Sequence, residues 1–285
     1  MSRDLDEHEP ERTPDTTRAP EVVVRPLPEP GRPVPGQEPR VPDRDRHAIE
    51  RYRLSRDEVE TLREIGKFRV VNADDLRRFR YQGYGPAMRQ DLRSLRTQRL
   101  LQQRTLVDRG KKSSVLVLTG EGRKLLRGDP EMPREQAIYA GLVKPREAPH
   151  DAAIYRMYHA EAASIRARGG TVRRVVLDYE LKRRVYAPLA KDRPKLRPEE
   201  YARRQAEVAA ENRLDVVNGK IPVPDLRIEY QTREGEMAKV DLELATAHYH
   251  AAQIAEKAGA GFVVYHEGGG AKPEDRDLIS EILSL

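Results

Sequence analysis

Three carboxylates in two neighbouring segments of the chain could together hold a divalent cation. Asp225 opens the first segment, and Asp241 and Glu243 lie close together in the second. Carboxylates held close to one another repel, and a divalent cation with oxygen ligands relieves that repulsion. A Mg²⁺ or Mn²⁺ ion held there could activate a water molecule as a nucleophile, so these acids are the candidate catalytic and metal-binding residues.

The segments around these acids predict a β-hairpin that would bring them together. Residues 224–230 and 239–245 alternate apolar and polar side chains, and the polar turn at 232–236 contains a glycine. Successive side chains point to opposite faces of a strand, so the acids fall on the face away from the apolar residues. If the two strands pair in register, the three carboxylates converge at one end of a small sheet.

Two further kinds of residue would complete such a centre. Glu161, on a helix predicted from about residue 151 to 168, could add a metal ligand. Lys257, on the helix predicted after the acids, could steady the nucleophile or the leaving group, and Lys239 is a second candidate for that role. The alternative is a structural role, in which the acids are solvated or paired with arginines such as Arg227.

The basic residues of the chain are concentrated in one block. The chain has 285 residues and a formal net charge of +6, but residues 51–128 alone carry 20 Lys and Arg against 9 Asp and Glu. The rest of the chain is therefore mildly acidic. A basic block of this kind predicts a polyanionic partner.

The order of elements predicted in this block is that of a winged helix-turn-helix domain at residues 54–128. A capping box at Ser55 and Glu58 begins the first helix. The predicted helices cover 55–66, 73–80 and 86–99, and a hairpin at 100–118 with a basic tip precedes a fourth helix that ends near 127. Winged-helix proteins place one helix in the major groove of double-stranded DNA.

Polar side chains on the third helix and at the hairpin tip are the candidate DNA contacts. Arginine and glutamine pair with guanine and adenine edges, and cations at the tip would contact phosphates. The candidate residues are Tyr84, Arg89, Gln90, Arg93, Arg96, Arg109, Lys111 and Lys112. The alternative is a solvated basic face on a domain that docks another protein.

The remaining segments predict a two-domain chain of the α+β class. Residues 1–47 hold 10 of the 21 prolines and few large apolar side chains, which predicts a disordered tail. Residues 129–149 are expected to be a linker. Residues 150–285 predict an α/β domain, with a mixed sheet flanked by helices and an insertion at 185–221. Its order is helix, strand, insertion, strand, strand, helix, strand, with the first strand expected at 171–182 and a final short helix at 273–285.

Composition also excludes some kinds of chemistry and indicates a cellular compartment. The absence of cysteine excludes disulfides, thiolate metal sites and cysteine nucleophiles, and it fits a reducing cytoplasm. The N-terminus lacks the apolar stretch of a signal peptide, and no apolar run approaches the ~20 residues of a membrane helix. We therefore expect a cytoplasmic protein without a membrane partner.

The second domain resembles the PD-(D/E)xK nuclease superfamily. The order of its predicted elements is the core order of that fold, and Asp225 and Glu243 stand at the places of its two acids. One position departs from the family pattern, in which a lysine is expected two residues after the second acid. That place is Ala245 if Glu243 is the second acid, or Glu243 itself if Asp241 is. The resemblance implies a nuclease-like domain, with Lys257 as a displaced substitute for the missing lysine.

Residues 54–265 together are similar to the replication-relaxation family of bacterial mobile elements. The basic winged helix, His150-Asp151 at the start of the long helix, Asp225 and the pair Asp241 and Glu243 carry this resemblance. It implies a DNA-binding accessory protein for the replication or relaxation of a plasmid or another mobile element. Its partners would be double-stranded DNA and replication or conjugation proteins.

Two other functions fit the same residues. A metal-dependent endonuclease would nick DNA with Asp225, Asp241 and Glu243 as metal ligands. A winged-helix transcription regulator would bind its operator as a homodimer, with two half-sites about one helical turn apart. The accessory-protein hypothesis requires DNA binding but does not require the nuclease-like domain to cleave.

Overall fold

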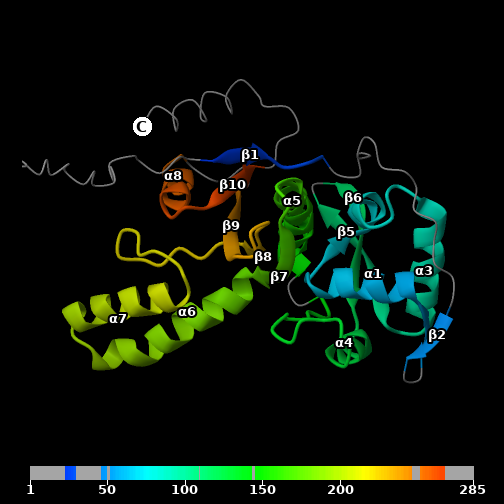
Figure 1. Cartoon of the computed structure of the whole chain (residues 1–285), viewed down its shortest axis with the longest axis horizontal. Helices are drawn as coiled ribbons and strands as arrows, with labels where there is room; N and C mark the ends of the chain where they lie inside the picture. Colours follow the sequence, from blue (N-terminus) through cyan, green and yellow to red (C-terminus); the bar gives the residue numbers. More distant parts are fainter. Residues whose placement is uncertain are drawn as a thin grey trace, which may run out of the picture.

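The computed structural model describes residues 23–29, 46–49, 52–108, 110–142, 145–245 and 251–266. The chain has a mixed sheet flanked by helices, which confirms the α+β class at this level. Figure 1 shows two parts on either side of the long helix α5 (Ala148–Ala167). We call the part that contains α1 to α4 the helix–hairpin unit, and the part that contains the five-stranded sheet the sheet unit. Within the described ranges, no helix is both long enough and apolar enough to cross a membrane.

The helix–hairpin unit spans residues 52–127 and surrounds a small sheet of order β4-β6-β5. Its helices are α1 (Arg56–Gly66), α2 (Ala73–Phe79), α3 (Gly85–Thr97) and α4 (Gly120–Arg127). Its strands are β4 (Val71–Asn72), β5 (Leu101–Asp108) and β6 (Lys111–Leu118). A separate antiparallel pair, β2 (Arg46–Ile49) and β3 (Tyr52–Ser55), leads into α1.

Local sequence signals explain where these elements begin. Ser55 and Glu58 form the expected capping box of α1, because the Glu58 N–H donates to Ser55 Oγ at 3.1 Å and the Ser55 N–H donates to Glu58 Oε2 at 2.7 Å. Thr119 caps α4 in a similar way through the N–H of Gly122. Gly122 is needed for close packing, because a Cβ there would lie 2.3 Å from the carbonyl oxygen of Leu100.

The sheet unit is built on a five-stranded sheet of order β1-β10-β9-β8-β7. Its strands are β1 (Val24–Pro26), β7 (Thr171–Leu177), β8 (Leu226–Gln231), β9 (Met237–Ala245) and β10 (Val263–His266). Its further helices are α6 (Asp178–Asp192), α7 (Pro198–Glu211) and α8 (Ala251–Gly259). Strands β7, β8 and β9 are antiparallel, whereas β9, β10 and β1 are parallel.

The two faces of this sheet bury different side chains. Helix α5 covers one face, where Ile228 of β8 and Leu242 of β9 join the main hydrophobic core. A second core lies where β7 meets α6 and α7, and it contains Val176, Val185 and Val208. Because side chains alternate along β9, Asp241 and Glu243 point away from α5. The hairpin of α6 and α7 extends from the sheet on the side far from α3 (Figure 1).

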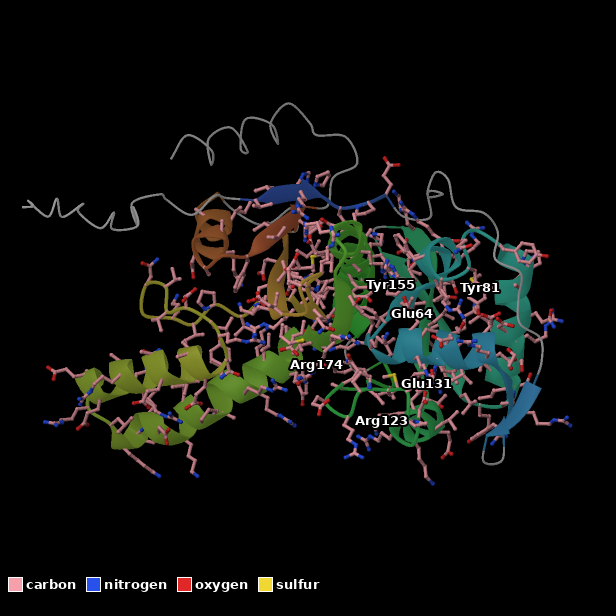
Figure 2. All side chains as sticks on the ribbon, viewed as in Figure 1. Glu64, Tyr81, Arg123, Glu131, Tyr155 and Arg174 are labelled. Atoms are coloured by element: carbon pink, nitrogen blue, oxygen red, sulfur yellow. The ribbon has the colours of Figure 1, made fainter. Side chains whose placement is uncertain are left out.

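The helix–hairpin unit and the sheet unit share one core along α5. The ring of Phe68 meets Tyr155 of α5 edge-on at 5.0 Å, and Phe79 stacks on His159 at 4.3 Å between ring centroids. Tyr155 also donates a hydrogen bond from its hydroxyl to Glu64 of α1 at 3.0 Å; both residues are labelled in Figure 2. These contacts fix the two units against each other, because their large apolar side chains fill a common interior.

The segment expected to be a linker, residues 129–149, is bonded to both units where it is described. The side-chain amide of Gln136 accepts from the Val175 N–H and donates to the Val175 carbonyl, both at 2.9 Å. The Tyr139 N–H donates to the carbonyl of Gly66 at 2.9 Å. The side chain of Gln136 thus makes the two hydrogen bonds to the edge of β7 that a neighbouring strand would make. Sequence periodicity does not reveal this role.

Two other segments differ from the sequence-based expectation, and a third expected element is not described. Parts of the expected disordered tail at 1–47 form strands, since Val24 pairs with Val264 and β2 pairs with β3. The strand predicted from Thr171 to Lys182 ends at Leu177, where α6 begins and buries apolar residues at spacings of four. The helix predicted at 273–285 lies outside the described residues.

Candidate nucleic-acid interface and acid–base cluster

Helix α3 presents an exposed basic face and buries an apolar one. Leu92 and Leu95 are buried, and the side chains expected to contact DNA from this helix are exposed. Those exposed side chains are Arg89, Gln90, Arg93 and Arg96. None of these arginines has an acidic partner within the described part of the chain, although Arg96 donates to Gln103 at 2.9 Å. The face is therefore a set of cations available to an external anion.

A shallow depression of about 350 Å³ runs along this face of α3. Its lining residues are Arg53, Gln90, Arg93, Ser94, Thr97 and Gln98. Strand β3 extends the surface, because the Arg53 N–H donates to Gln98 Oε1 at 3.1 Å and Gln98 donates back to the Arg53 carbonyl at the same distance. The cationic surface therefore includes one arginine that sequence analysis did not select.

The β5–β6 hairpin carries the other cations expected to contact DNA. Lys111 and Lys112 are exposed at its tip, opposite Asp108 and Val107 in the strand register. Arg109 lies outside the described residues. Tyr84, at the start of α3, is 39% exposed. The described lysines and Tyr84 are thus accessible to a ligand.

Asp241 is enclosed by cations on the sheet. Arg227, its cross-strand partner, donates to both carboxylate oxygens at 2.6 and 3.0 Å, and both side chains are about 4% exposed or less. Lys239 adds a third contact at 2.5 Å. Arg227 also donates to the carbonyl of Asn212 at 2.6 Å. Asp241 therefore forms an internal ion pair with Arg227, which is the pairing expected if the acids have a structural role.

Asp225, Glu243 and Lys257 lie together at the end of β8 and β9. Lys257 Nζ is 2.8 Å from Glu243 Oε1, so the lysine of α8 reaches the acid of β9. The Leu244 N–H donates to Asp225 Oδ2 at 2.9 Å, and the Asp225 N–H donates to Glu243 Oε2 at 3.3 Å. The pairing of the two strands brings the two acids together, and α8 adds the lysine; we call these three residues the acid–base cluster.

His150, at the start of α5, joins this cluster through Asp225. Its Nε2 lies 3.4 Å from Asp225 Oδ2. Burial would lower the pKa of His150, but the hydrogen bond and the charge of Asp225 raise it overall. Burial would raise the pKa of Asp225, but the hydrogen bond and charge of His150, the Leu244 N–H and the charge of Lys257 lower it. The pair therefore favours an ionised Asp225.

Glu161 lies on the other side of the sheet from these acids. Its Oε2 accepts from the hydroxyl of Tyr265 at 2.9 Å and from Arg25 Nη1 at 2.5 Å. Tyr265 belongs to the core on the α5 face, opposite to the face of Asp241 and Glu243. The structure therefore does not bring Glu161 to the other expected metal ligands, because α5 turns this side chain toward β10 and β1.

The arrangement leaves two acids as candidates for holding a divalent cation. In the described residues, no group of three or more His, Cys, Asp or Glu side chains is arranged to hold a metal ion. Asp241 is bound to Arg227 and Lys239, and Glu161 lies beyond the sheet. Asp225 and Glu243 supply the oxygen ligands that Mg²⁺ prefers, with Lys257 beside them.

Sequence analysis missed Lys182, which lies beside the same cluster. It pairs with Asp178 at 2.8 Å. Burial would lower the pKa of Lys182, but Asp178 and then the charges of Asp225 and Glu243 raise it. The spacing of Asp178 and Lys182, four residues apart, is a helical pair that could have revealed the helix here. Its position near Asp225 depends on the tertiary fold.

Comparisons with family models, with curated proteins and with solved structures found no match to this chain.

Proposed function

We propose that this chain binds double-stranded DNA through α3 and the β5–β6 hairpin. The observation that carries the proposal is the exposed face of α3, whose arginines have no acidic partner among the described residues. In this proposal the helix–hairpin unit is a winged helix-turn-helix domain and α3 is its recognition helix. The apolar side chains of α3 hold the helix against the unit while the cations face outward.

The chemistry of this face suits a duplex. Arginine and glutamine pair with the edges of guanine and adenine in the major groove, where an α-helix fits. Lys111 and Lys112 at the hairpin tip would contact phosphates beside the groove. Arg53, in the depression next to α3, would add a further backbone contact. Binding would therefore combine base recognition with a salt-sensitive electrostatic contribution.

The biological role that we propose is that of an accessory protein in the replication or relaxation of a plasmid or another mobile element. The support for it is the motif resemblance together with the order α5, β7, insertion, β8, β9, α8, β10. This order corresponds to that of the PD-(D/E)xK nuclease core. The proposal requires DNA binding and leaves cleavage to a separate test.

DNA binding is tested by fluorescence anisotropy with a labelled duplex and an unlabelled competitor duplex. Replacing Arg89, Arg93 and Arg96 together by Ala should weaken binding by about a hundredfold, because base and phosphate contacts are both removed. Thermal unfolding of the variant should match the wild type, since these side chains are exposed. Unchanged affinity of a folded triple variant would exclude α3 as the DNA-binding surface.

A charge-matched control separates local contacts from the overall charge of the chain. Lys191, Lys195 and Arg203 are exposed cations around the end of the α6–α7 hairpin, on the side far from α3. Replacing these three by Ala removes the same charge. The account predicts less than a threefold change in affinity, because charges beyond a Debye length of about 10 Å are largely screened.

A second candidate function is metal-dependent nicking of DNA. The observation that favours it is the cluster of Asp225, Glu243 and Lys257, in which Lys257 Nζ lies 2.8 Å from Glu243. Asp225 and Glu243 would hold Mg²⁺ or Mn²⁺, and the ion would activate a water molecule. Lys257 could then leave Glu243 and steady the nucleophile or the leaving group.

Nicking is tested with supercoiled plasmid in the presence of Mg²⁺, Mn²⁺ or EDTA. The expected result for a nuclease is metal-dependent nicking that is lost in both Asp225→Asn and Lys257→Met. Glu161→Gln is the matched control, because Glu161 is a buried acid on the opposite face of the sheet. Absence of nicking with every metal, while the duplex still binds, would exclude this second candidate.

A further inference from the structure

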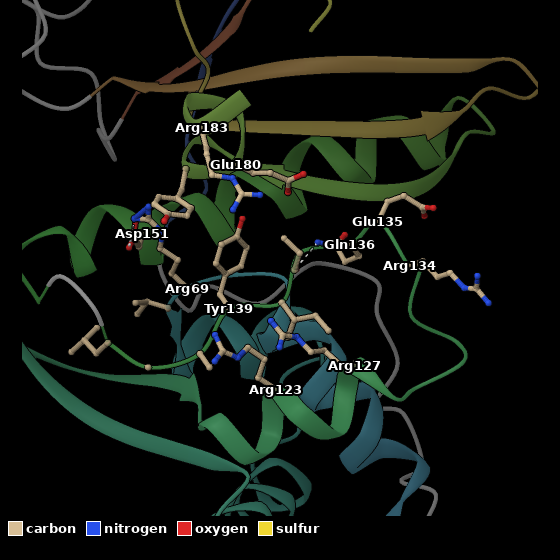
Figure 3. A pocket seen from close by; sticks show the side chains of 17 residues that line it. Arg69, Arg123, Arg127, Arg134, Glu135, Gln136, Tyr139, Asp151, Glu180 and Arg183 are labelled. Carbon is tan, nitrogen blue, oxygen red and sulfur yellow. Dashed lines mark hydrogen bonds and ion pairs between the residues drawn. The ribbon is translucent and has the colours of Figure 1, made fainter. Parts of the chain in front are cut away.

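A cavity of about 600 Å³ lies between the helix–hairpin unit and the sheet unit. Its lining comes mainly from α4, the segment 134–142 and the start of α6, with Arg69 and Val70 before β4 and Asp151 of α5 completing it. Figure 3 shows Arg123 and Arg127 of α4 on one side of the cavity, Arg183 of α6 across from them, and Tyr139 between. Its volume falls within the range of about 300 to 1,000 Å³ that is typical of small-molecule sites.

The cavity has more cations than its acids can neutralise. Arg123, Arg127 and Arg183 have no acidic partner within the described ranges. The acids of the lining are already occupied where they are buried. Asp151 pairs with Arg69 at 3.5 Å, and Glu180 accepts from Arg174 and Arg184. The unmatched guanidinium groups therefore come from both units and surround a common space, which suits a ligand with several negative charges.

Much of the remaining lining is apolar or aromatic, beside Arg134, Glu135 and Gln136. Val70, Ile138 and Leu142 contribute aliphatic surface, and Tyr179 is 59% exposed at the edge. The hydroxyl of Tyr139 is buried and has no hydrogen-bond partner among the residues that the structure describes. A buried polar atom without a partner is uncommon and costs free energy, so a ligand that contacts it would be stabilised. This surface suits a planar, partly polar group beside the anionic one.

We propose that this cavity binds a nucleoside phosphate, with its phosphates on Arg123, Arg127 and Arg183 and its base against the tyrosines. Guanidinium groups match phosphate oxygens in pairs, and bases stack on aromatic and guanidinium planes. The ligand can be a free nucleotide or an unpaired nucleotide within a DNA strand, because both carry the same chemical groups. The proposal does not depend on duplex binding by α3, since α4 and α6 supply the charged side chains.

A bound nucleotide would add a further link between the two units, besides α5 and the segment 129–149. Arg123 and Arg127 belong to the helix–hairpin unit, whereas Arg183 belongs to the sheet unit. The cavity is also adjacent to the acid–base cluster, because its lining residues Asp151 and Tyr179 are sequence neighbours of His150 and Asp178. Occupancy of the cavity would therefore stabilise the junction beside Asp225.

The test is isothermal titration calorimetry of the full chain with ATP, with GTP, with a 5′-phosphorylated thymidine hexanucleotide and with inorganic pyrophosphate, all in EDTA. At least one nucleotide ligand should bind at least tenfold more tightly than pyrophosphate. The Arg123→Ala, Arg127→Ala double variant should weaken that binding by at least tenfold. Tyr179→Ala should weaken nucleotide binding by roughly tenfold through lost stacking and leave pyrophosphate unchanged.

Two controls make the result specific. The Lys195→Ala, Arg203→Ala double variant removes the same charge from the α6–α7 hairpin and should bind nucleotides like the wild type. The α3 triple variant should also retain nucleotide binding, which distinguishes this site from the duplex-binding surface. Binding by the hexanucleotide but not by ATP or GTP would identify the ligand as a nucleotide within a strand.

The proposal would be overturned by any of three results. The first is that no nucleotide ligand binds the wild type. The second is that pyrophosphate binds as tightly as every nucleotide. The third is that the folded Arg123→Ala, Arg127→Ala variant binds the nucleotides with unchanged affinity. Thermal unfolding of each variant shows whether it is folded. If the double variant unfolds, the single change Tyr179→Ala carries the test, because Tyr179 is exposed and outside both cores.

Discussion

Arginine side chains occur in two opposite settings in this chain, on α3 and inside the sheet. Arg89 and Arg93 of α3 are exposed and have no acidic partner in the part of the chain that the structure describes. Arg227 of β8 is 4% exposed and donates to both oxygens of the equally buried Asp241. The same guanidinium group is therefore exposed and available to an external anion in one setting, and neutralises an internal carboxylate in the other.

The difference in burial between these arginines determines how the two charged regions can act. A buried ion pair is held by mutual neutralisation, and removing one partner leaves an uncompensated charge in the interior. Exposed cations are solvated, so they can contact phosphates and release counterions without disturbing the fold. Lys257 and Glu243 are intermediate, because the lysine is 20% exposed and the acid 3%. A reaction at the sheet would thus depend on Lys257, Glu243 and Asp225 rather than on Asp241.

The largest effect on stability is expected for Arg227→Ala. Its loss leaves the buried carboxylate of Asp241 with Lys239 as its remaining ionic contact, so the free energy of unfolding should fall by about 3 kcal/mol. Urea unfolding measures this change. The Arg227→Ala, Asp241→Ala double variant should recover part of the loss, because no buried charge is then left. A change within 0.5 kcal/mol for Arg227→Ala, on the order of an ordinary surface substitution, would contradict the role of this pair.

A smaller effect is expected for Lys257→Met at the acid–base cluster. The change removes the cation beside Glu243 but keeps most of the side chain, so the free energy of unfolding should fall by about 1.5 kcal/mol. The same urea experiment provides the measurement. Lys195→Met, at an exposed position, is the matched control and should leave stability unchanged. Equal stability of the two variants would show that the Lys257–Glu243 contact does not support the fold.

Asp91, on the inner face of α3, is expected to give an effect of the opposite sign. Burial raises its pKa from 3.8 to about 6, although the Tyr81 hydroxyl donates to it at 2.9 Å. The folded chain therefore holds the proton more tightly than the unfolded chain, and this group reduces stability as pH rises from about 4 to 6.

Asp91→Asn should consequently be more stable than the wild type at pH 7, by up to about 3 kcal/mol, which is the value of a shift of roughly two pKa units. At pH 3.5 the two proteins should be equally stable, since the aspartate is then protonated in the folded chain. Thermal unfolding at both pH values measures the difference. A gap that is the same at pH 3.5 and pH 7 would contradict the raised pKa of Asp91.

The smallest effect on stability is expected for Arg93→Ala. Its side chain is exposed on α3, so the free energy of unfolding should change by less than about 0.5 kcal/mol. The same substitution should weaken duplex binding by roughly tenfold, because one base or phosphate contact is lost. A loss of stability as large as that of Arg227→Ala would remove the contrast between the two settings.

Much of the fold could be predicted from the sequence because the relevant signals are local. The apolar spacing of Leu92 and Leu95 indicates the buried face of α3, and the capping box at Ser55 indicates where α1 begins. Alternation along residues 239–245 places Asp241 and Glu243 on one face of β9, as observed. These patterns depend on neighbours within one element, so one sequence is enough to read them.

The remaining features depend on contacts between distant segments. The sequence predicts Lys257 as a substitute lysine, but only the packing of α8 on the sheet brings it to Glu243. Gln136 bonds to the edge of β7, and no periodic pattern marks a single glutamine for that role. The strand predicted through Lys182 follows the β-branched run that ends at Leu177, whereas the tertiary fold favours a helix from that point.

The most direct test of DNA binding by the helix–hairpin unit is the salt dependence of duplex affinity. Each phosphate contact contributes about 0.9 to the slope of log affinity against log salt concentration. The Lys111→Ala, Lys112→Ala variant should therefore have a slope smaller by about 1.8 than the wild type. Lys191→Ala, Lys195→Ala removes the same charge at exposed positions far from α3 and should keep the wild-type slope. Equal slopes for all three proteins would contradict contact between the hairpin tip and the DNA backbone.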